Sequence, residues 1–471
     1  INLKTLKSVT IKPQAGANEA KLRWNWNTPI HIGQHNPKNL YCGAQYLFKS
    51  TDKGTNWTRI SPDLTTNDKK KQEQENSGGL SADNTSAENH TTIFTIAESP
   101  LDENMIWVGT DDGNLQVTTD GGKTWTNTSA AIAAAGIPAQ AWVSSVEPSR
   151  FDKNLVFASF DNHMYGDHKT WVAKSVDGGK NWTVLKSPEF TGFAHKIRQD
   201  LVNRDLLFLG TEMGLFASVD GGASWFRMKN RIPEYALVRD IQIHPVTNDL
   251  ILGTHGRGVI VVDDISPMRA LTPEVLNKEV HIFASKPMPL NMGRFGDGGF
   301  PATGGWSGGN PAGIPPIQYY LKDKVMTGDV KLDVYDAQGK LVQSIPGSKR
   351  KGINSIYWNR RMTPVKAAPG GTKMDQAGFA APMVMPGDYT LKLTVGDKQY
   401  TDKITLVHDA SNTNFTMADR EMQNKAALEM YGMQAELNSL IESINAEQKL
   451  LRDNTIKVKS PKTRKVLMEY N

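Results

Sequence analysis

Short apolar stretches separated by polar turns run through the first 265 residues. Three segments share one pattern: a strand-like stretch ends in small residues, a polar loop follows, and a second stretch leads into a tight turn. They are MIWVGTDDGNLQVTTDGG, LVFASFDNHMYGDHKTWVAKSVDGG and LLFLGTEMGLFASVDGG. A further apolar stretch precedes each, such as IFTIAESP or WVSSVEPS. Stretches of this length and composition are typical of β-strands, and their order predicts repeated units of four strands.

One octet of the form S/T-x-D-x-G-x-x-W closes four of these units. A short hydroxyl side chain and an aspartate can hydrogen-bond the backbone of a tight turn, and glycine allows the positive φ that such a turn requires. The tryptophan then buries its ring on the next strand. We therefore predict four hairpins with structural rather than catalytic aspartates. Their defining residues are Ser50, Asp52, Gly54 and Trp57; Thr118, Asp120, Gly122 and Trp125; Ser175, Asp177, Gly179 and Trp182; and Ser218, Asp220, Gly222 and Trp225.

Repeated four-stranded units indicate a mainly β fold built from β-propeller blades. A fifth unit, residues 241–264, has apolar stretches but no octet. We therefore expect about five blades over residues 1–265, the last of them incomplete. Because such a ring would have two open edges, we expect further blades elsewhere in the protein or in another chain. The alternative is a small propeller in which residues 5–12 supply the missing strand.

The octets resemble Asp-boxes, also called BNR repeats, of the propellers in sortilin-type receptors, sialidases and xyloglucanases. Stretches such as SPDLTTND (61–68), WVGTDDG (107–113) and GTHGRG (253–258) are similar to those of large secreted bacterial sortilin-like proteins, often labelled glycosyl hydrolases. The resemblance implies that this chain is a C-terminal portion, with a signal peptide and more blades upstream. It also implies a binding scaffold that is secreted, at the cell surface or periplasmic.

The pattern changes after the propeller. Residues 266–325 include a Gly/Pro-rich run at 292–316, which predicts an extended connector. Alternation and two-residue turns then favour a small antiparallel β-sandwich over residues 326–410, and PGDYTLKLTV resembles the last hairpin of a fibronectin-like domain.

Helical spacing begins at Thr416 and defines a segment over residues 411–471. Thr416 and Asp419 fit a capping box at the start of an amphipathic helix. We expect its apolar stripe to pack on the sandwich, on a second helix or on another chain. The stripe consists of Met430, Met433, Leu437, Leu440, Ile444 and Leu451.

Composition and charge argue against several classes of function. The chain has 54 Lys and Arg against 49 Asp and Glu, a net charge of +5 over 471 residues, which argues against nucleic-acid binding. The sequence has no apolar window long enough for a transmembrane helix. Its one cysteine, Cys42, excludes an intrachain disulfide, and the ten histidines show no metal-ligand spacing. We expect neither a metal nor a cofactor.

The loops between the second and third strands of each blade lie opposite the octet hairpins and are expected to meet on one rim. Propellers can bind ligands there. The alternative is that these residues only form hydrated turns. The candidate ligand-binding residues are Asp111, Asp112, Asp161, His163, Glu212, His255 and Arg257.

The leading interpretation is a non-catalytic propeller that binds a protein, a peptide or a glycan, with envelope or secreted proteins as further partners. A second hypothesis is a sialidase- or xyloglucanase-like glycoside hydrolase. Asp112 and Glu212 could be its carboxylates, which would need to lie about 5–9.5 Å apart. The Arg231-Ile232-Pro233 tripeptide resembles the Arg-Ile-Pro motif of sialidases. It follows the fourth octet instead of preceding the first, which argues against sialidase chemistry. A third hypothesis is a structural subunit of an envelope complex.

Overall fold

The computed structural model describes residues 4–6, 8–73, 89–229, 232–290, 315–365, 381–409 and 415–469. It divides into two compact units, Ile1–Pro273 and Glu274–Asn471, which are described separately.

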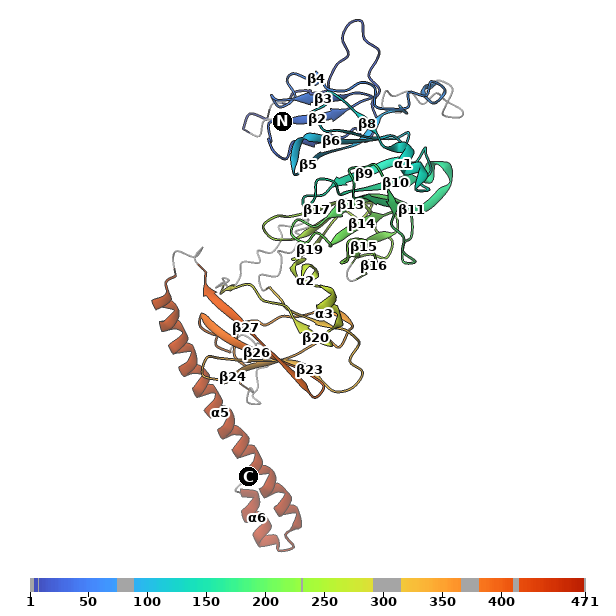
Figure 1. Ribbon diagram of the computed structural model, residues 1–471. Coiled ribbons are helices and arrows are strands. Elements are labelled where there is room, and N and C mark those ends of the chain that lie inside the picture. The colour runs from blue at the N-terminus through green and yellow to red at the C-terminus, as the bar shows by residue number, and fades with distance from the viewer. Residues whose placement is uncertain are drawn as a thin grey trace. The chain divides into compact units, whose positions relative to one another are not determined.

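The first unit consists of five small antiparallel sheets that follow one another in chain order (Figure 1). Four sheets have four strands and the fifth has three, which confirms the mainly β, propeller-type fold. The strands are β1 (Ile30–Ile32), β2 (Leu40–Gly43), β3 (Leu47–Ser50) and β4 (Thr58–Arg59); β5 (Ile93–Ser99), β6 (Asp102–Thr110), β7 (Leu115–Thr118) and β8 (Thr126–Asn127); β9 (Trp142–Pro148), β10 (Val156–Asn162), β11 (Asp167–Ser175) and β12 (Thr183–Val184); β13 (Ala194–Gln199), β14 (Leu207–Thr211), β15 (Gly214–Ser218) and β16 (Phe226–Arg227); and β17 (Leu237–Ile243), β18 (Leu250–His255) and β19 (Val259–Val262).

Short helical segments lie between these strands or follow β19. They are η1 (Lys70–Gln72), α1 (Ser129–Ala134), η3 (His163–Tyr165), α2 (Ser266–Arg269) and α3 (Pro273–Asn277).

The hydrophobic core of this unit lies between neighbouring sheets. Tyr41 and Leu47 of the first sheet pack with Ile106 of the second. Trp107 of the second sheet meets Trp182 of the third edge to face, with ring centroids 6.4 Å apart. Each sheet therefore buries its faces against its neighbours, as blades of a propeller do.

The octets form the tight turns between the third and fourth strands. In the second octet, Thr118 Oγ1 donates to Asp120 Oδ1 at 2.8 Å and accepts from the Gly122 amide at 2.9 Å. Gly122 has a φ of +101°, and the other three octets repeat these contacts. Trp125 Nε1 then donates to the Ile60 carbonyl of the preceding blade segment, which links the turn to its neighbour.

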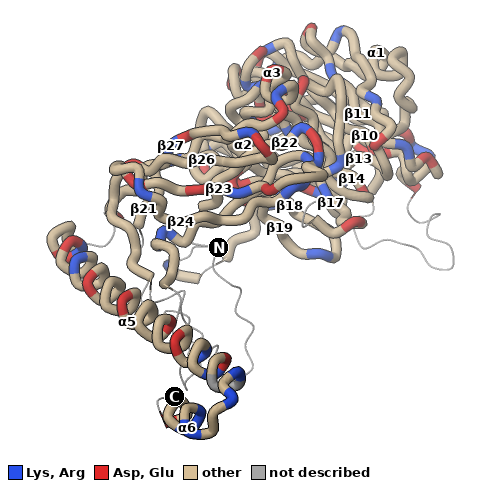
Figure 2. Tube along the Cα trace, turned by 90° about the horizontal axis from the view of Figure 1, so that it is seen from below, with Lys and Arg blue, Asp and Glu red and all other residues tan. Residues whose placement is uncertain are grey.

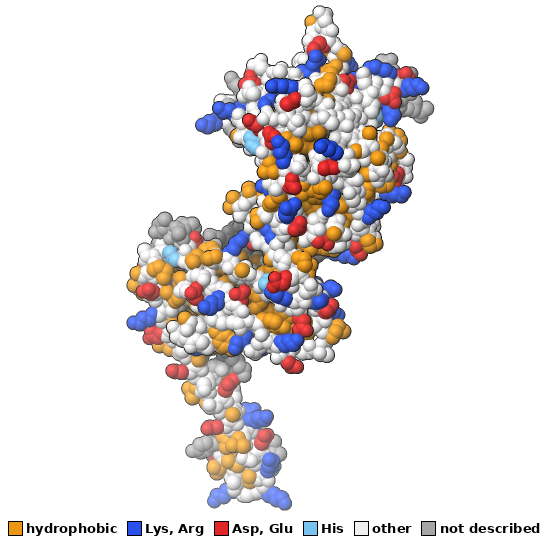
Figure 3. Space-filling model, in the orientation of Figure 1, with side chains coloured by type: hydrophobic (Ala, Val, Ile, Leu, Met, Phe, Trp, Pro, Cys, Tyr) orange, Lys and Arg blue, Asp and Glu red, His pale blue; other side chains and the backbone are white. Residues whose placement is uncertain are grey.

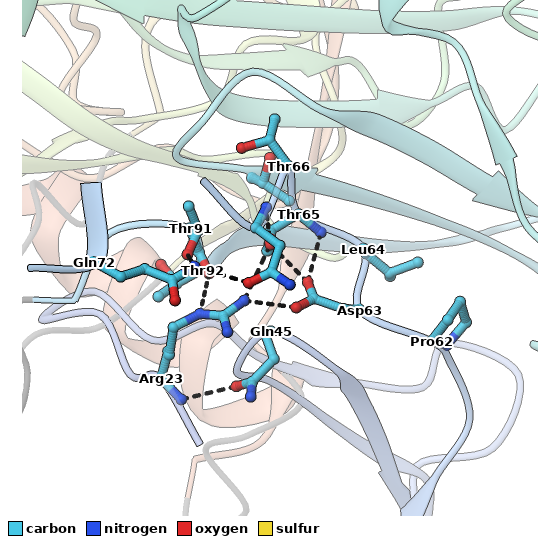
Figure 4. Close-up of polar contacts among 12 residues, drawn as sticks. Arg23, Gln45, Pro62, Asp63, Leu64, Thr65, Thr66, Gln72, Thr91 and Thr92 are labelled. Atoms are coloured by element: carbon cyan, nitrogen blue, oxygen red, sulfur yellow. Dashed lines mark hydrogen bonds and ion pairs between the residues drawn. The ribbon is translucent and has the colours of Figure 1, made fainter. Parts of the chain in front are cut away.

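Arg23 secures both described ends of the polar insertion at residues 61–91 (Figure 4). Its guanidinium pairs with Asp63 at 2.7 Å, and its Nε donates to the Thr91 carbonyl at 3.0 Å. The Arg23 amide also donates to Gln45 Oε1. The middle of the insertion, residues 74–88, lies outside the described residues.

The second unit contains a three-stranded sheet, β20–β22–β25, and a five-stranded sheet, β21–β27–β26–β23–β24. One hydrophobic cluster includes residues of both, so they form a sandwich. The strands are β20 (Val280–Ile282), β21 (Met288–Leu290), β22 (Ile317–Leu321), β23 (Val330–Tyr335), β24 (Leu341–Pro346), β25 (Gly352–Ile356), β26 (Gly387–Val395) and β27 (Lys398–His408).

The expectation that residues 266–325 form only a connector is corrected by β20, β21 and β22. These strands bury apolar residues in the sandwich core, among them Met288, Leu290 and Tyr319. Each of these strands is held in place because its apolar side chains pack against the facing sheet of the sandwich. Most of the Gly/Pro-rich run itself, 291–314, lies outside the described residues, as does Arg231 of the Arg-Ile-Pro tripeptide.

Helix α5 (Met417–Lys457) begins at the predicted capping box, in which Thr416 and Asp419 bond each other's backbone amides. Arg420 donates to the Met383 and Val384 carbonyls, and the Tyr431 hydroxyl donates to the Thr363 carbonyl. A shorter helix, α6 (Pro461–Glu469), packs against α5.

The apolar stripe of α5 is not buried on the sandwich, and its packing on another chain stays a prediction. Five of its residues are 46–70% exposed: Met430, Met433, Leu437, Leu440 and Ile444. Acidic and basic residues alternate with others along the helix (Figure 2). Arg420 and Tyr431, in the N-terminal half of α5, make polar contacts with the second unit.

Candidate functional site

The first strands of the five blades, β1, β5, β9, β13 and β17, line a common cavity of about 530 Å³. Neighbouring members of this set lie against each other. Side chains alternate along a strand, so every second residue of each strand can face the cavity. His31, Ser144, Lys196 and Asp240 reach it from four different blades. A second cavity of about 360 Å³ adjoins the first, since Phe94, Ser144, His195 and Arg239 line both.

The larger cavity is lined mostly by polar atoms and carries charges of both signs. Arg198 pairs with Glu147 at 2.8 Å, and Lys196 Nζ lies 3.6 Å from Asp240. Burial lowers the pKa of Lys196 because it removes water from the ammonium group. The side chain of Asp240 is 51% exposed, whereas that of Glu147 is 13% exposed and also accepts from the Gln199 amide.

Aromatic rings form part of the smaller cavity. The ring of Phe94 packs edge to face with Trp142, with centroids 5.3 Å apart. Trp142 Nε1 and His195 Nε2 are both buried and have no hydrogen-bond partner among the described residues. Burial lowers the pKa of His195 to about 3, so its imidazole is neutral at ordinary pH. Buried polar atoms usually have partners, so these two mark a place for a ligand or for water.

Two of the sequence-predicted rim residues meet in this smaller cavity. His163 Nδ1 lies 2.6 Å from Asp161 Oδ1, and the His163 amide also donates to that oxygen at 3.0 Å. The Asp161 side chain is 8% exposed and the His163 side chain 34%. The carboxylate is therefore held in place and still borders the cavity.

Asp111 and Asp112 lie elsewhere and are engaged in the structure of the blades. Asp111 is fully buried and accepts from Thr92 and from Asn25 Nδ2. Burial raises the pKa of Asp111 to about 7. Asp112 accepts from the amide and hydroxyl of Thr66. Neither carboxyl group lines either cavity.

Glu212, His255 and Arg257 also lie outside both cavities. Glu212 is half-buried beside Gly192, and its amide donates to the Phe193 carbonyl. His255 and Arg257 are exposed at the turn between β18 and β19. Of the seven residues predicted to share one rim, only Asp161 and His163 border one of these two cavities.

Sequence reasoning missed the residues of the first strands. Their signal was charge at alternate positions, as in AHKIRQ (194–199), where Lys196 and Arg198 both line the larger cavity. Such alternation is also what a solvent-facing strand shows, so it does not by itself indicate a site.

Within the described ranges, no group of three or more His, Cys, Asp or Glu side chains could hold a metal ion. No helix there is long and apolar enough to cross a membrane. On the face shown in Figure 3, basic and acidic side chains are interspersed.

No protein-family model matches the sequence. The chain is 26% identical over 219 residues to a xyloglucanase from a Paenibacillus species, a match that covers 36% of this chain and 20% of the relative. Similar solved structures include the GH74 xyloglucanase from Xanthomonas campestris, at 13% identity over 79% of this chain and 57% of that one, with a TM-score of 0.39. YCF48 from Cyanidioschyzon merolae is 19% identical over 36% of this chain and 55% of that one, with a TM-score of 0.26.

The chain therefore spans about a fifth of the curated relative and little more than half of these two structures. The interpretation as a non-catalytic binding protein is corrected by the similarity to a xyloglucanase, which supports the glycoside hydrolase alternative. The five consecutive sheets support the propeller part of the expected resemblance, the similarity to a xyloglucanase supports its glycoside hydrolase-like part, and its sortilin-specific part stays a prediction.

Proposed function

We propose that this chain is part of a glycoside hydrolase that acts on a polysaccharide, with the sugar chain bound across the first strands of the blades. The observation that carries the proposal is the 26% identity to a xyloglucanase over 219 residues. Two adjoining cavities bordered by carboxylates and aromatic rings support it, because sugar-cleaving sites need both a concave surface and acidic groups.

Hydrolysis of a glycosidic bond needs two carboxyl groups, about 5–9.5 Å apart according to the stereochemical outcome. Asp161 borders the smaller cavity, and two N–H groups of His163 orient its Oδ1. We assign it as general base or nucleophile. Asp240 borders the larger cavity and is assigned as the second carboxyl group of the reaction. Arg239, the residue before Asp240, lines both cavities and so lies where they adjoin.

Two other features fit this assignment. Glu147 is held by Arg198 and the Gln199 amide, so it serves the wall of the cavity rather than the reaction. The rings of Trp142 and Phe94 offer an apolar surface on which a pyranose ring can rest, while Trp142 Nε1 remains free to donate to a sugar hydroxyl.

The test is a reducing-end assay with the purified chain on xyloglucan and on a panel of other polysaccharides. We expect turnover, and we expect Asp161→Asn and Asp240→Asn each to lower kcat at least about 100-fold. Asp205→Asn, at an exposed position outside both cavities, is the matched control and should leave kcat unchanged. Absence of turnover on every polysaccharide, or full activity of Asp161→Asn, would contradict the proposal.

We also propose that further blades, from the same protein or another chain, complete the ring, and that the protein acts outside the cytoplasm as a secreted, cell-surface or periplasmic protein. The fifth sheet of three strands, next to four sheets of four, supports the first point. The octets, whose hydroxyl, aspartate and glycine contacts repeat four times, support their assignment as Asp-boxes of the sortilin-like type.

A further inference from the structure

The larger cavity has more cationic than anionic side chains. Arg150, Lys196, Arg198 and Arg239 line it together with only two carboxylates. Those carboxylates, Glu147 and Asp240, already pair with Arg198 and Lys196.

Two guanidinium groups of the cavity therefore have no carboxylate to pair with among its lining residues. Arg150 is half-buried and Arg239 is exposed, and neither has an ion-pair partner in the described part of the chain. A guanidinium group presents a rigid set of N–H donors that fits a carboxylate or a sulfate in bidentate geometry. Because water is partly excluded from a concave wall, such a pair is stronger there than on an open surface.

Unpartnered nitrogens beside Arg239 provide a second, independent observation. His195 is 5% exposed, borders both cavities, and its Nε2 has no hydrogen-bond partner among the described residues. Trp142 Nε1, in the smaller cavity with Arg239, is equally without one and can only donate. Arg239 thus shares one cavity with a buried indole N–H, which can only donate, and with a buried imidazole nitrogen, and neither has a partner among the described residues.

We propose that this cavity binds an acidic sugar unit, a pyranose that carries a carboxylate or a sulfate ester, with Arg239 paired to the anionic group. Trp142 Nε1 and His195 contact the same unit, and Arg150 binds a second anionic group along the chain. This inference rests on the proposed glycoside hydrolase and names its substrate class as an acidic polysaccharide. A wholly neutral chain would leave both guanidinium groups without a partner.

Calorimetric titration of the purified chain tests the proposal without relying on turnover. The probes are trigalacturonate, a sulfated galactan trisaccharide and a neutral xyloglucan oligosaccharide. We expect at least one acidic probe to bind about tenfold or more tightly than the neutral one at low salt, and the preference to shrink as salt rises. The first two probes distinguish carboxylate from sulfate as the recognised group.

Arg239→Gln should lower the affinity for the acidic probe to about the affinity for the neutral one. Arg239→Lys should keep only part of the difference in affinity, since an ammonium group lacks bidentate geometry. Arg257→Gln is the matched control, because Arg257 is exposed and lines neither cavity. Arg239 is exposed, so its variants should fold, which circular dichroism checks.

Equal binding of acidic and neutral probes, or an unchanged preference in Arg239→Gln, would overturn the inference. An acidic probe that binds through Arg239 but is never cleaved would support the inference and count against the hydrolase alone. Cleavage of a neutral polysaccharide without any preference for acidic probes would support the hydrolase and overturn this inference.

Discussion

His163 Nδ1 lies 2.6 Å from Oδ1 of Asp161, and the His163 ring stacks on Phe193 with centroids 4.2 Å apart. The stacked ring restricts rotation of the imidazole, so the donor that orients the Asp161 carboxylate is itself held in place. His163 is therefore a positioning residue for the proposed reaction, and its substitution should act through the geometry of Asp161.

We predict that His163→Ala lowers kcat on the cleaved polysaccharide at least about tenfold with little change in KM. His163→Asn, whose side-chain amide can replace the Nδ1 donor, should recover part of the loss, which a purely structural role would not produce. His168→Ala is the matched control, because His168 also lies near Phe193 but makes no contact with Asp161 among the described residues. Equal kcat values for His163→Ala and wild type would contradict the role.

Asp111 should make the stability of the first unit depend on pH in an unusual direction. Burial raises its pKa to about 7 in the folded chain, against 3.8 for an ordinary aspartate. Between these values the folded chain keeps a proton that the unfolded chain has lost, so the free energy of unfolding should fall as pH rises. The slope is at most about 1.4 kcal/mol per pH unit and flattens above pH 7.

Denaturant unfolding followed by tryptophan fluorescence at pH values from 4 to 8 measures this slope. Asp111→Asn, which cannot ionise, should remove its contribution, whereas Asp205→Asn at an exposed position should retain it. An identical pH slope in Asp111→Asn and wild type would show that another group is responsible.

The octet turns illustrate what can be predicted from sequence. Thr118, Asp120 and Gly122 bond one another within five residues, so the motif contains nearly all the interactions that define the turn. The strand order of the blades follows from the same local repeats.

The site depends on longer-range packing and was harder to predict. Asp111 and Asp112 stand side by side in the sequence as an obvious acidic pair, yet Thr92 and Thr66, distant in sequence, use their hydrogen-bonding capacity. The cavity that contains Lys196 and Asp240 exists only because first strands from five blades come together. Nothing in the sequence of a single strand indicates which of its two faces will meet that cavity.

Gly122 should tolerate no side chain. It has a φ of +101°, and an added Cβ would lie 2.4 Å from the Ile60 carbonyl oxygen, part of the backbone of the preceding blade segment. Gly122→Ala is expected to destabilise the first unit by about 2–4 kcal/mol, through the positive φ and the clash together.

Gly121 provides the matched comparison within the same turn. Its φ is +72°, but an added Cβ would meet only the end of the Asn104 side chain, at 3.3 Å. Gly121→Ala should therefore cost about 1 kcal/mol, the strain of the left-handed backbone alone. Chemical denaturation of both variants measures the difference, and equal losses would mean that the contact with Ile60 relaxes at no cost.

Arg269 joins α2 to the fourth and fifth blades through a buried ion pair. Its Nε and Nη2 bind both oxygens of Asp200 at 2.8–3.1 Å, and its Nη1 donates to Asn248 Oδ1 at 2.7 Å. The Asp200 side chain is 0% exposed and also accepts from the Val202 and Asn203 amides.

Removing one partner of such a pair leaves the other charge buried without compensation, so we expect Arg269→Met to lower the free energy of unfolding by about 3–5 kcal/mol. Lys153 and Asp102 form a pair that is equally short, 2.6 Å, but their side chains are 50% and 21% exposed. Lys153→Met should cost under about 1 kcal/mol, because water screens the exposed pair. In the double variant Arg269→Met with Asp200→Asn, part of the loss should return, since the buried charge is gone while the amide oxygen still accepts from the backbone. Denaturant unfolding of the four proteins decides the matter: similar losses for Arg269→Met and Lys153→Met would show that burial of Asp200 is not what makes the pair matter.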